Sequence, residues 1–213
     1  MQLDDYLMIK NHSLFSFVFW VLFLMGCSEE KPLSYEDAIK NCKPDTMLMI
    51  GKEDTIKIPE LPLSCLEGAQ LPLFETAMMD GRALNPDYFE GKISIINFWF
   101  IGCKPCEEEM PGFNALVEKY REEPVQFLAF SLNKPEDIKE FCNEHPFNVD
   151  HVAMAELIIQ DFFKYTWGYP VTMVADQHGK IIHIQRASQK KVPLDQGLQE
   201  DLIPVIDEAL KKI

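Results

Sequence analysis

Basic residues are scarce in this sequence: 20 Lys and Arg stand against 34 Asp and Glu, for a formal net charge of -14. Proteins that bind nucleic acids need clustered Lys and Arg to neutralise phosphates. We therefore expect no nucleic-acid partner. The 213 residues, 47% of them hydrophobic, suffice for one globular core with an appendage rather than for two full domains.

Apolar runs long enough to span a membrane are also missing. The run at residues 14–25 has twelve residues, whereas a membrane-crossing helix needs about 20. A signal-peptide core needs only about 7 to 15 and ends at small residues. This run ends at Gly26 and Cys27, and residues 24–27 resemble the bacterial lipobox, whose Cys is lipidated. We therefore predict a lipoprotein signal peptide over residues 1–26 and lipidation of Cys27, with a buried core helix as the alternative.

The predicted signal peptide has one unusual feature, because Asp4 and Asp5 make its start acidic. Translation from Met8 would remove both acids and leave a basic lead. Acyl chains on Cys27 would anchor the protein, and stable attachment needs more than one chain. The rest of the chain would then lie outside the cytoplasm in the bacterial cell envelope, where disulfides persist.

Residues 27–70 predict a tether followed by a β-rich extension. Two apolar runs at residues 46–50 and 55–58 flank a polar break that contains Gly51, which is typical of a hairpin. Cys42 and Cys65 lie on either side of this hairpin. A disulfide between them would close a loop worth roughly 3 kcal/mol. Two separately buried thiols are the alternative, and the sequence leaves the choice open.

Residues 71–213 alternate between strand and helix patterns. Strand candidates occur at residues 73–79, 92–100, 125–131, 171–176 and 180–187. Helix candidates occur at residues 107–122, 135–145, 156–165 and 195–212, with a short helical connector at 85–89. This order predicts an α/β fold in which a mixed sheet carries helices on both faces.

Six cysteines are too few for a disulfide scaffold in a chain of this length, so each spacing is informative. Cys103 and Cys106 form a CxxC pair that follows a buried strand and starts a helix. Backbone N–H groups and the helix dipole favour a thiolate at the first Cys, which can attack a disulfide, and the second can resolve the mixed disulfide. Half of a zinc site is the competing interpretation. It needs a second pair of ligands, and none appears at a suitable spacing, so we expect no metal.

The segment around this pair resembles the active site of thioredoxin-fold proteins. Residues 97–106 carry the likeness, and the continuation through Pro111 resembles the TlpA/ResA branch of that fold. That branch comprises membrane-anchored extracytoplasmic thiol-disulfide oxidoreductases. The resemblance implies a thioredoxin fold over residues 71–213, with no cofactor beyond the redox-active disulfide of the CxxC pair.

Further segments support the same resemblance. Residues 130–133 and the helix at residues 137–144 are similar to the central insertion of the branch. Residues 168–172 and 176–180 are similar to its later segments.

The resemblance implies roles for individual residues. Cys103 would be the nucleophile and Cys106 the resolving thiol. Pro170 matches the cis-proline that lies against the CxxC pair. Tyr169 would contact substrate and Cys103, with a surface aromatic as the alternative. Glu109 matches a glutamate that tunes the thiol pKa and proton transfer, with a solvated helix charge as the alternative.

Three more residues complete the predicted substrate-binding surface. Lys104 and Pro105 lie between the two cysteines, and Trp99 would pack beside the pair. A plain core aromatic is the alternative for Trp99.

The sequence departs from the thioredoxin pattern at two places. Asn97 stands where thioredoxins carry a buried acid, so Glu109 becomes the better candidate for proton transfer to Cys106. Phe100 and Ile101 replace the small and polar residues usual before the pair. The mouth of the site should therefore be more apolar and favour unfolded or hydrophobic protein segments.

Three glutamates at residues 107–109 raise the cost of a thiolate at Cys103, and Lys104 partly offsets them. We therefore predict a reducing couple, and a redox potential as high as that of DsbA would contradict this. Cys142, on the insertion helix, is expected to be a buried core thiol, with a regulatory or third redox cysteine as the alternative.

Three classes of function follow. The first is a lipid-anchored reductase of disulfides in envelope proteins, such as apocytochromes, supplied with electrons by a membrane donor of the CcdA/DsbD type. The second is an AhpC/TSA-like peroxide reductase, which normally needs a Thr three residues before the attacking Cys, where Phe100 stands. The third is a non-catalytic envelope lipoprotein for binding or assembly.

Overall fold

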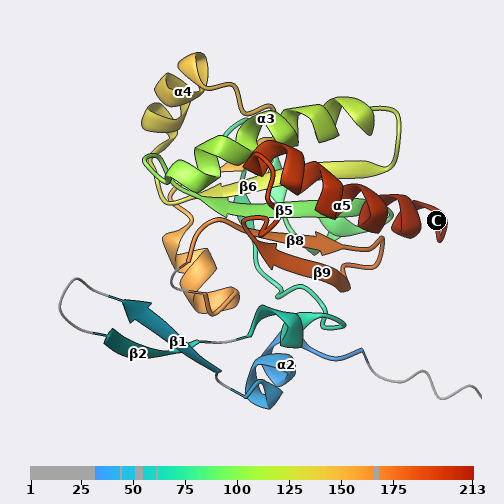
Figure 1. Ribbon diagram of the computed structural model, residues 1–213. Helices are drawn as coiled ribbons and strands as arrows, with labels where there is room; N and C mark the ends of the chain where they lie inside the picture. The colour runs from blue at the N-terminus through green and yellow to red at the C-terminus, as the bar shows by residue number, and fades with distance from the viewer. Residues whose placement is uncertain (1–31, 44, 51–54, 61, 166–167) are drawn as a thin grey trace, which may run out of the picture. The chain divides into compact units, whose positions relative to one another are not determined.

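A five-stranded mixed sheet organises the computed structural model, which describes residues 32–213 except 44, 51–54, 61 and 166–167 (Figure 1). The strand order is β7-β6-β5-β8-β9. Strands β5, β6 and β7 run parallel, whereas β8 and β9 are antiparallel to their neighbours. The strands are β5 (Ile93–Trp99), β6 (Val125–Ser131), β7 (Asp150–Val152), β8 (Val171–Ala175) and β9 (Ile181–Arg186).

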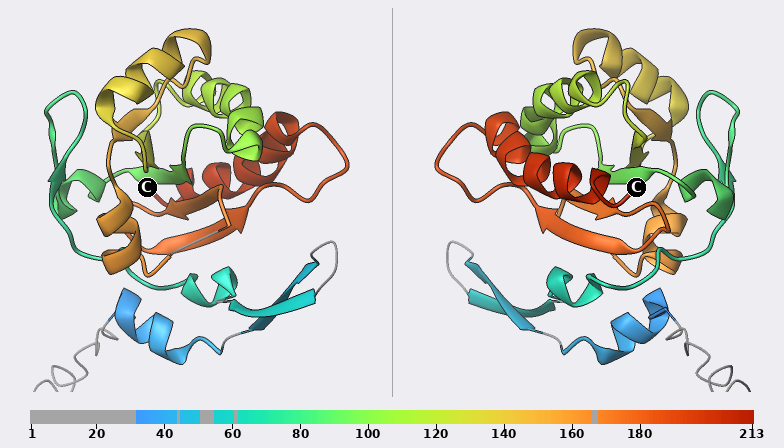
Figure 2. Two further views of the ribbon diagram at one scale, coloured as in Figure 1. Left: turned by 90° about the vertical axis from the view of Figure 1, so that its left-hand side faces the viewer. Right: turned by 90° about the vertical axis from the view of Figure 1, so that its right-hand side faces the viewer.

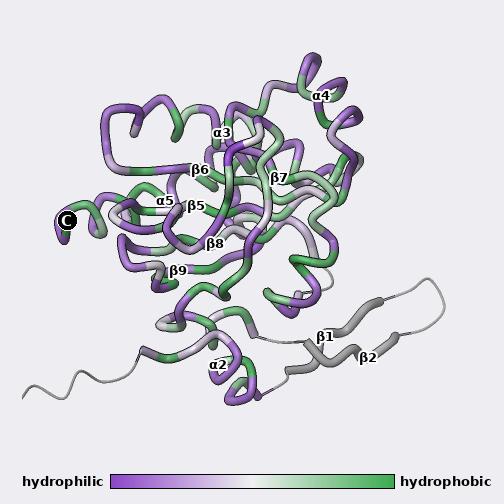
Figure 3. Tube along the Cα trace, turned by 180° about the vertical axis from the view of Figure 1, so that it is seen from behind, coloured by the Kyte–Doolittle hydropathy of each residue, from purple (hydrophilic) through white to green (hydrophobic). Residues whose placement is uncertain are grey.

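Helices cover both faces of this sheet, as expected from the sequence. The helices α3 (Lys104–Lys119) and α5 (Leu194–Leu210) pack on one face, where buried Ile95 and Leu198 belong to the same core cluster. The buried residue of α4 (Pro135–Glu144) belongs to that cluster too. Seen from behind, apolar residues follow the strands, whereas α4 is mainly polar (Figure 3). All seven residues of β5 are buried, because this central strand is covered on both faces.

The other face is covered by short elements from earlier in the chain and by a turn before β8. They are α2 (Tyr35–Asn41), η1 (Leu63–Leu66), β3 (Thr76–Ala77), β4 (Ala83–Leu84), η2 (Pro86–Phe89) and η3 (Ile158–Phe162). Tyr35 and Leu66 share a core cluster with Phe98 of β5. Residues 33–213 form one compact unit.

The expected N-terminal hairpin is present. Strand β1 (Asp45–Ile50) pairs antiparallel with β2 (Thr55–Glu60). Cys42 and Cys65, on either side of the hairpin, are joined by a disulfide with a Cα–Cα distance of 5.7 Å. This bond ties the end of α2 to η1 and decides between the two alternatives that the sequence left open.

Three expected elements need correction. The strand expected at residues 73–79 is reduced to the two residues of β3, because Phe74 and Met78 pack into the core without a neighbouring strand over that length. Helix α3 begins at Lys104 rather than at residue 107, because Pro105 fits the first turn, where its missing N–H is not needed. The helix expected at residues 156–165 contains the π-helical turn η3.

Among the described residues, no helix has the length and apolar content needed to cross a membrane. The predicted signal peptide and Cys27 lie outside the described residues.

Candidate active site

The CxxC pair lies where β5 ends and α3 begins. Cys103 is the N-cap of α3, and Cys106 lies in its first turn. The two form a disulfide with a Cα–Cα distance of 5.3 Å. Cys103 is 5% exposed and Cys106 is 3% exposed, so the oxidised pair is nearly closed off from solvent. The helix N-terminus places backbone N–H groups and a positive dipole end beside Cys103, which favours its thiolate on reduction.

Two side-chain hydrogen bonds fix the loop before the pair. The Ile101 N–H donates to Asn133 Oδ1 at 2.8 Å, and the Gly102 N–H donates to Glu107 Oε1 at 2.9 Å. Gly102 has a φ of +90°, a backbone conformation that residues with a side chain rarely adopt. The path of the chain into Cys103 is therefore set by Gly102 and by contacts from β6 and α3.

Pro170 lies at the start of β8, beside the end of β5. The Tyr169–Pro170 peptide bond is cis, as the resemblance implied. The Tyr169 ring meets the Phe100 ring edge-on, with centroids 5.4 Å apart. Burial, with smaller contributions from Tyr165 and Glu156, raises the pKa of Tyr169 to about 12. Tyr169 is thus a half-buried wall of the mouth of the site rather than a free surface aromatic.

Glu109, one turn after Cys106, is buried and only 1% exposed. Neither carboxylate oxygen has a hydrogen-bond partner. Burial raises its pKa to about 8. The nearby Ser188 backbone N–H lowers the pKa, although its geometry falls short of a hydrogen bond, and Asp201 raises the pKa further. The alternative of a solvated helix charge is therefore wrong. Glu109 can hold or release a proton near neutral pH.

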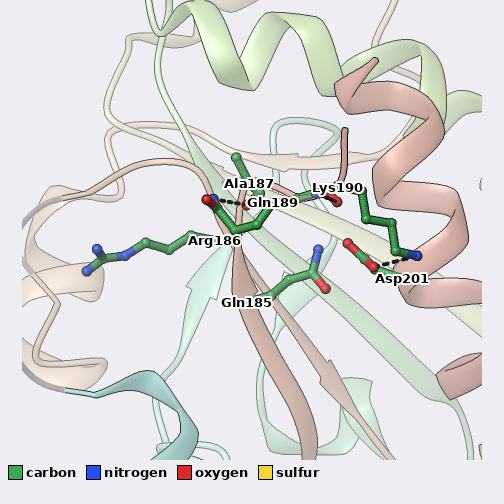
Figure 4. A pocket seen from close by; sticks show the side chains of 7 residues that line it. Gln185, Arg186, Ala187, Gln189, Lys190 and Asp201 are labelled. Carbon is green, nitrogen blue, oxygen red and sulfur yellow. Dashed lines mark hydrogen bonds and ion pairs between the residues drawn. The ribbon is translucent and has the colours of Figure 1, made fainter. Parts of the chain in front are cut away.

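An open cavity of about 730 Å³ lies under the segment that joins β9 to α5 (Figure 4). Ser188 and Asp201, which both act on the pKa of Glu109, line it. Lys190 pairs with Asp201 at 2.9 Å across this cavity. Six of its seven lining residues are polar or charged.

Asn97 lies on β5, six residues before Cys103, and is 3% exposed. Its Nδ2 donates to Thr172 Oγ1 at 3.1 Å and to the Val171 carbonyl at 3.4 Å. These bonds join β5 to β8 beside Pro170. An amide cannot exchange a proton with Cys106, so the contribution of Asn97 that the structure shows is to join the two strands.

Trp99, Lys104 and Pro105 occupy very different environments. Trp99 is 0% exposed and packs against Phe141 and Phe147, so it matches a core aromatic and presents no surface to a substrate. The Lys104 side chain is 84% exposed and pairs with Glu108 at 3.7 Å. Pro105 is also exposed. The prediction that Trp99 contacts substrate is therefore wrong, whereas Lys104 and Pro105 are accessible to a substrate.

Cys142 is half-buried and free rather than a fully buried core thiol, and burial raises its pKa. In the part of the chain that the structure describes, no group of three His, Cys, Asp or Glu could hold a metal ion.

Sequence reasoning missed one residue of this site. Asn133 carries the hydrogen bond that fixes Ile101, and its own carbonyl accepts from the Met154 N–H at 2.9 Å. Asn133 stands 32 positions from Ile101 in the chain. Only the adjacency of β5 and β6 brings the two together, so no local pattern could have indicated the contact.

Comparisons with known proteins give matches over most of the chain. The model of the AhpC/TSA family matches residues 68–208. The thiol-disulfide oxidoreductase ResA of Bacillus thuringiensis subsp. konkukian is 30% identical over 139 residues, covering 62% of this chain and 77% of the relative. ResA of Halalkalibacterium halodurans is 26% identical over 145 residues, covering 68% of this chain and 77% of the relative.

Solved structures give the same fold. The thioredoxin domain of a thiol-disulfide oxidoreductase from Bacteroides vulgatus has a TM-score of 0.55 at 19% identity, covering 66% of this chain and 97% of that chain. A thiol:disulfide interchange protein from Bacteroides sp. has a TM-score of 0.54 at 20% identity, covering 66% of this chain and 90% of that chain. At this identity the likeness shows the fold alone, and the expected thioredoxin fold is confirmed.

Proposed function

Because the chain belongs to the AhpC/TSA family and is a TlpA/ResA-like thiol-disulfide oxidoreductase of thioredoxin fold, we propose that it reduces disulfides of envelope proteins through Cys103 and Cys106. One observation carries the proposal. The two cysteines are joined at the N-terminus of α3, next to the cis peptide bond before Pro170. This arrangement brings a nucleophile and its resolving thiol within bonding distance.

The reaction transfers two electrons from the protein to the client. The Cys103 thiolate attacks one sulfur of the client disulfide, the client S–S bond breaks, and the other client sulfur leaves as a thiolate. The Cys106 thiolate then attacks Cys103 Sγ in the mixed disulfide. The Cys103–Cys106 bond forms, and the second client sulfur leaves and takes up a proton. The client is reduced and the protein is oxidised.

Glu109 is the proposed acid–base group for this exchange. Its buried carboxyl lies one turn from Cys106, and with a pKa of about 8 the carboxylate fraction present near neutral pH can take the thiol proton. Asn97 cannot do so. The proton balance of the second step then closes without a buried acid on β5.

Anchoring and partners are further parts of the proposal. Lipidation of Cys27 would hold the protein at the envelope membrane, outside the cytoplasm. A membrane dithiol donor of the CcdA/DsbD type would reduce the Cys103–Cys106 disulfide after each turnover. Disulfide-bearing envelope proteins, with apocytochromes as one class, would be the clients. Radiolabelled palmitate should enter the wild type and not Cys27→Ser.

Insulin reduction with purified protein tests the activity. We expect the reduced wild type to cleave the insulin disulfides and Cys103→Ser to be inactive. Cys142→Ser is the matched control, because Cys142 is free and lies on α4. Equal activity of the wild type and Cys103→Ser would overturn the proposal and favour a binding or assembly lipoprotein.

A trapping experiment identifies the clients. In Cys106→Ser the resolving thiol is absent, so mixed disulfides with Cys103 should accumulate and can be identified by mass spectrometry. A redox titration of the wild type tests the direction of exchange. A potential as oxidising as that of DsbA would contradict a reductase.

Peroxide reduction is the second activity to test, because the chain belongs to the AhpC/TSA family. A peroxide-attacking Cys normally has a Thr hydroxyl three residues before it, and Phe100 occupies that place. The Phe100 ring packs against Tyr169 and offers no hydrogen bond to a peroxide. We expect negligible hydrogen peroxide consumption under conditions in which insulin is reduced.

A further inference from the structure

Four chain segments meet at the edge of the sheet that carries Cys103. The strand order β7-β6-β5-β8 places the residues after β7, β6 and β5 next to those before β8. In this order the segments carry Met154, Leu132, Phe100 with Ile101, and Tyr169. The left view of Figure 2 faces this edge, and α4 and η3 lie on opposite sides of it.

Two of these side chains are large, apolar and exposed. Met154 is 65% exposed and Leu132 is 36% exposed, whereas Phe100 and Ile101 are partly buried. Single exposed apolar residues need no explanation, but an apolar strip that continues from a catalytic pair indicates a contact surface. We call Leu132 and Met154 the apolar shelf.

Hydrogen bonds hold the shelf in a fixed position relative to the CxxC loop. Asn133 accepts from the Ile101 N–H through its side chain at 2.8 Å and from the Met154 N–H through its carbonyl at 2.9 Å. The Ala155 N–H donates to the Ser131 carbonyl at 2.9 Å. Asn133 thus joins the loops after β5, β6 and β7. Because the shelf is already held in place, little conformational entropy is lost when a client chain binds to it.

Met154 also has an unusual backbone. Its φ is +50°, in the left-handed region that residues with side chains disfavour. Such conformations persist where the surrounding structure holds them, and they are concentrated at functional sites. Here the held residue presents a flexible, polarisable side chain of the kind that suits varied apolar partners.

The charges around the strip are mainly acidic. Glu107 and Glu108 lie at the start of α3, where Lys104 pairs with Glu108, and the exposed Lys134 after Asn133 is a second cation near the strip. Glu156 lies two residues after Met154 and is close enough to act on Tyr169. With a chain charge of -14, this edge repels acidic segments and attracts basic ones.

From these observations we propose that the apolar shelf binds an extended, apolar segment of the client next to its reactive cysteine, with a preference for basic flanking residues. This inference rests on the proposed function and names its substrate class. Neighbouring strands are about 4.8 Å apart and an extended chain rises about 3.3 Å per residue. The strip from β7 to β8 therefore accommodates roughly four or five client residues.

The first test measures binding without redox chemistry. Fluorescent eight-residue peptides carry Ser in place of Cys, with apolar or polar neighbours and with Lys or Glu at the ends. We expect the oxidised wild type to bind the apolar, Lys-flanked peptide about tenfold more tightly than the polar one. Leu132→Gln/Met154→Gln should lose most of this preference. Equal binding of apolar and polar peptides by the wild type would overturn the shelf.

Ile213→Gln is the matched control. Ile213 is also apolar and 57% exposed. It follows Lys212, whose carbonyl accepts from Gln177, two residues after the end of β8 and so at the opposite edge of the sheet. This variant should bind all peptides like the wild type. A loss of preference as large as that of the double variant would overturn the inference, because exposed apolar area in general would then explain binding.

The second test measures exchange with the same peptides carrying Cys in a mixed disulfide with glutathione. The double variant should raise KM for apolar peptides about tenfold and leave kcat and the polar peptides unchanged. Equal loss for both peptide types would overturn the shelf. Exchange of all peptides at one rate would overturn the proposed binding role of the apolar shelf and leave the proposed function standing. Preferential binding without any exchange would support the shelf and overturn the proposed function.

Asn133→Ala provides a second variant that keeps Leu132 and Met154. It removes the acceptor of the Ile101 N–H, so the shelf and the CxxC loop should lose their fixed spacing. We expect a several-fold weaker preference for apolar peptides with an unchanged circular dichroism spectrum. An unchanged preference would show that the bracing by Asn133 is irrelevant to binding.

Discussion

Burial changes the acid–base chemistry of Glu109. Its carboxyl group is enclosed between α3 and the Ser188 segment, and both oxygens lack hydrogen-bond partners. The neutral acid is therefore favoured at neutral pH. A carboxyl group in this state acts as a proton reservoir beside Cys106 rather than as a fixed negative charge.

This burial predicts a specific dependence of stability on pH. The pKa of Glu109 is about 8 in the folded protein against an ordinary 4.5, so the folded state binds the extra proton between these values. Its contribution to the free energy of unfolding is complete below pH 4.5 and is lost as pH rises through 8, by on the order of 4 kcal/mol. Glu109→Gln should lack this component. Urea unfolding of both proteins at pH 5 and pH 9 measures the difference.

Glu108→Gln is the control for this measurement, because the Glu108 side chain is 49% exposed. It should retain the pH dependence of the wild type. The same change in slope for both variants would show that the net charge of the helix, and not burial of Glu109, causes the effect.

Glu109 should also control the rate of exchange. Replacing it with Gln removes the group that takes the proton from Cys106, and a lost acid–base group typically costs about 10²-fold or more. We expect insulin reduction by Glu109→Gln at pH 7 to fall by about this factor, with the difference shrinking above pH 8, where free thiolate becomes abundant. A pH–rate profile parallel to that of the wild type would rule out the proton-transfer role.

At the scale of elements, the sequence predicts the central part of the fold well. The strands β5 and β6 are continuous apolar runs, and α3, α4 and α5 carry clear helical patterns, so their positions are confirmed to within a few residues. The CxxC pair was found for the same reason, since its spacing and its place before a helix are local features.

Elements that depend on distant contacts were not predictable. Strand β7 has three residues, Asp150 to Val152, and is too short and polar to show a pattern. Tyr88 donates to Asp150 Oδ2 at 2.8 Å and Arg82 pairs with the same carboxylate, so contacts from other parts of the chain fix its place. The π-helical winding of η3 and the contact of Asn133 with Ile101 have the same origin.

The crossing of α3 and α5 depends on Gly112. A Cβ at this position would lie 2.4 Å from the Asp195 carbonyl oxygen, which belongs to the backbone and cannot move alone. Gly112→Ala should therefore lower the free energy of unfolding by about 1 to 3 kcal/mol, although Ala is the better helix former. Thermal or urea unfolding measures this change.

Ala115→Gly is the control for the helix propensity of α3. Ala115 is exposed on the same helix, so the reverse substitution should cost about 1 kcal/mol without any clash. A stabilised Gly112→Ala would contradict the close approach of the two helices.

On the scale of the whole molecule, the two disulfides lie on opposite faces of the sheet. Cys103 and Cys106 belong to the core cluster under α3 and α5, whereas Cys42 belongs to the cluster under α2 and η1 and Cys65 packs against it. Pairing of Cys42 with Cys65 is a tertiary property, because cysteine spacing alone does not determine connectivity. The sequence could therefore not settle it.

Removal of the second disulfide should change stability and leave the chemistry intact. The bond joins residues 23 positions apart, for which chain entropy gives about 3 kcal/mol. Cys42→Ala/Cys65→Ala should lose about this much free energy of unfolding under non-reducing conditions and still reduce insulin at the folded temperature. Cys142→Ala is the control and should change stability far less. An unchanged midpoint for the double variant would show that the bond does not brace the fold.

The order of strands at the active edge also has an evolutionary consequence. The groups that break and form S–S bonds are all carried by the start of α3, while the side chains that flank them come from loops after β6 and β7. These loops can change in composition without altering the cysteines, as long as Asn133 keeps its bonds to Ile101 and Met154. Lineages of this architecture can therefore diverge in the partners they accept while inheriting one unaltered chemical step.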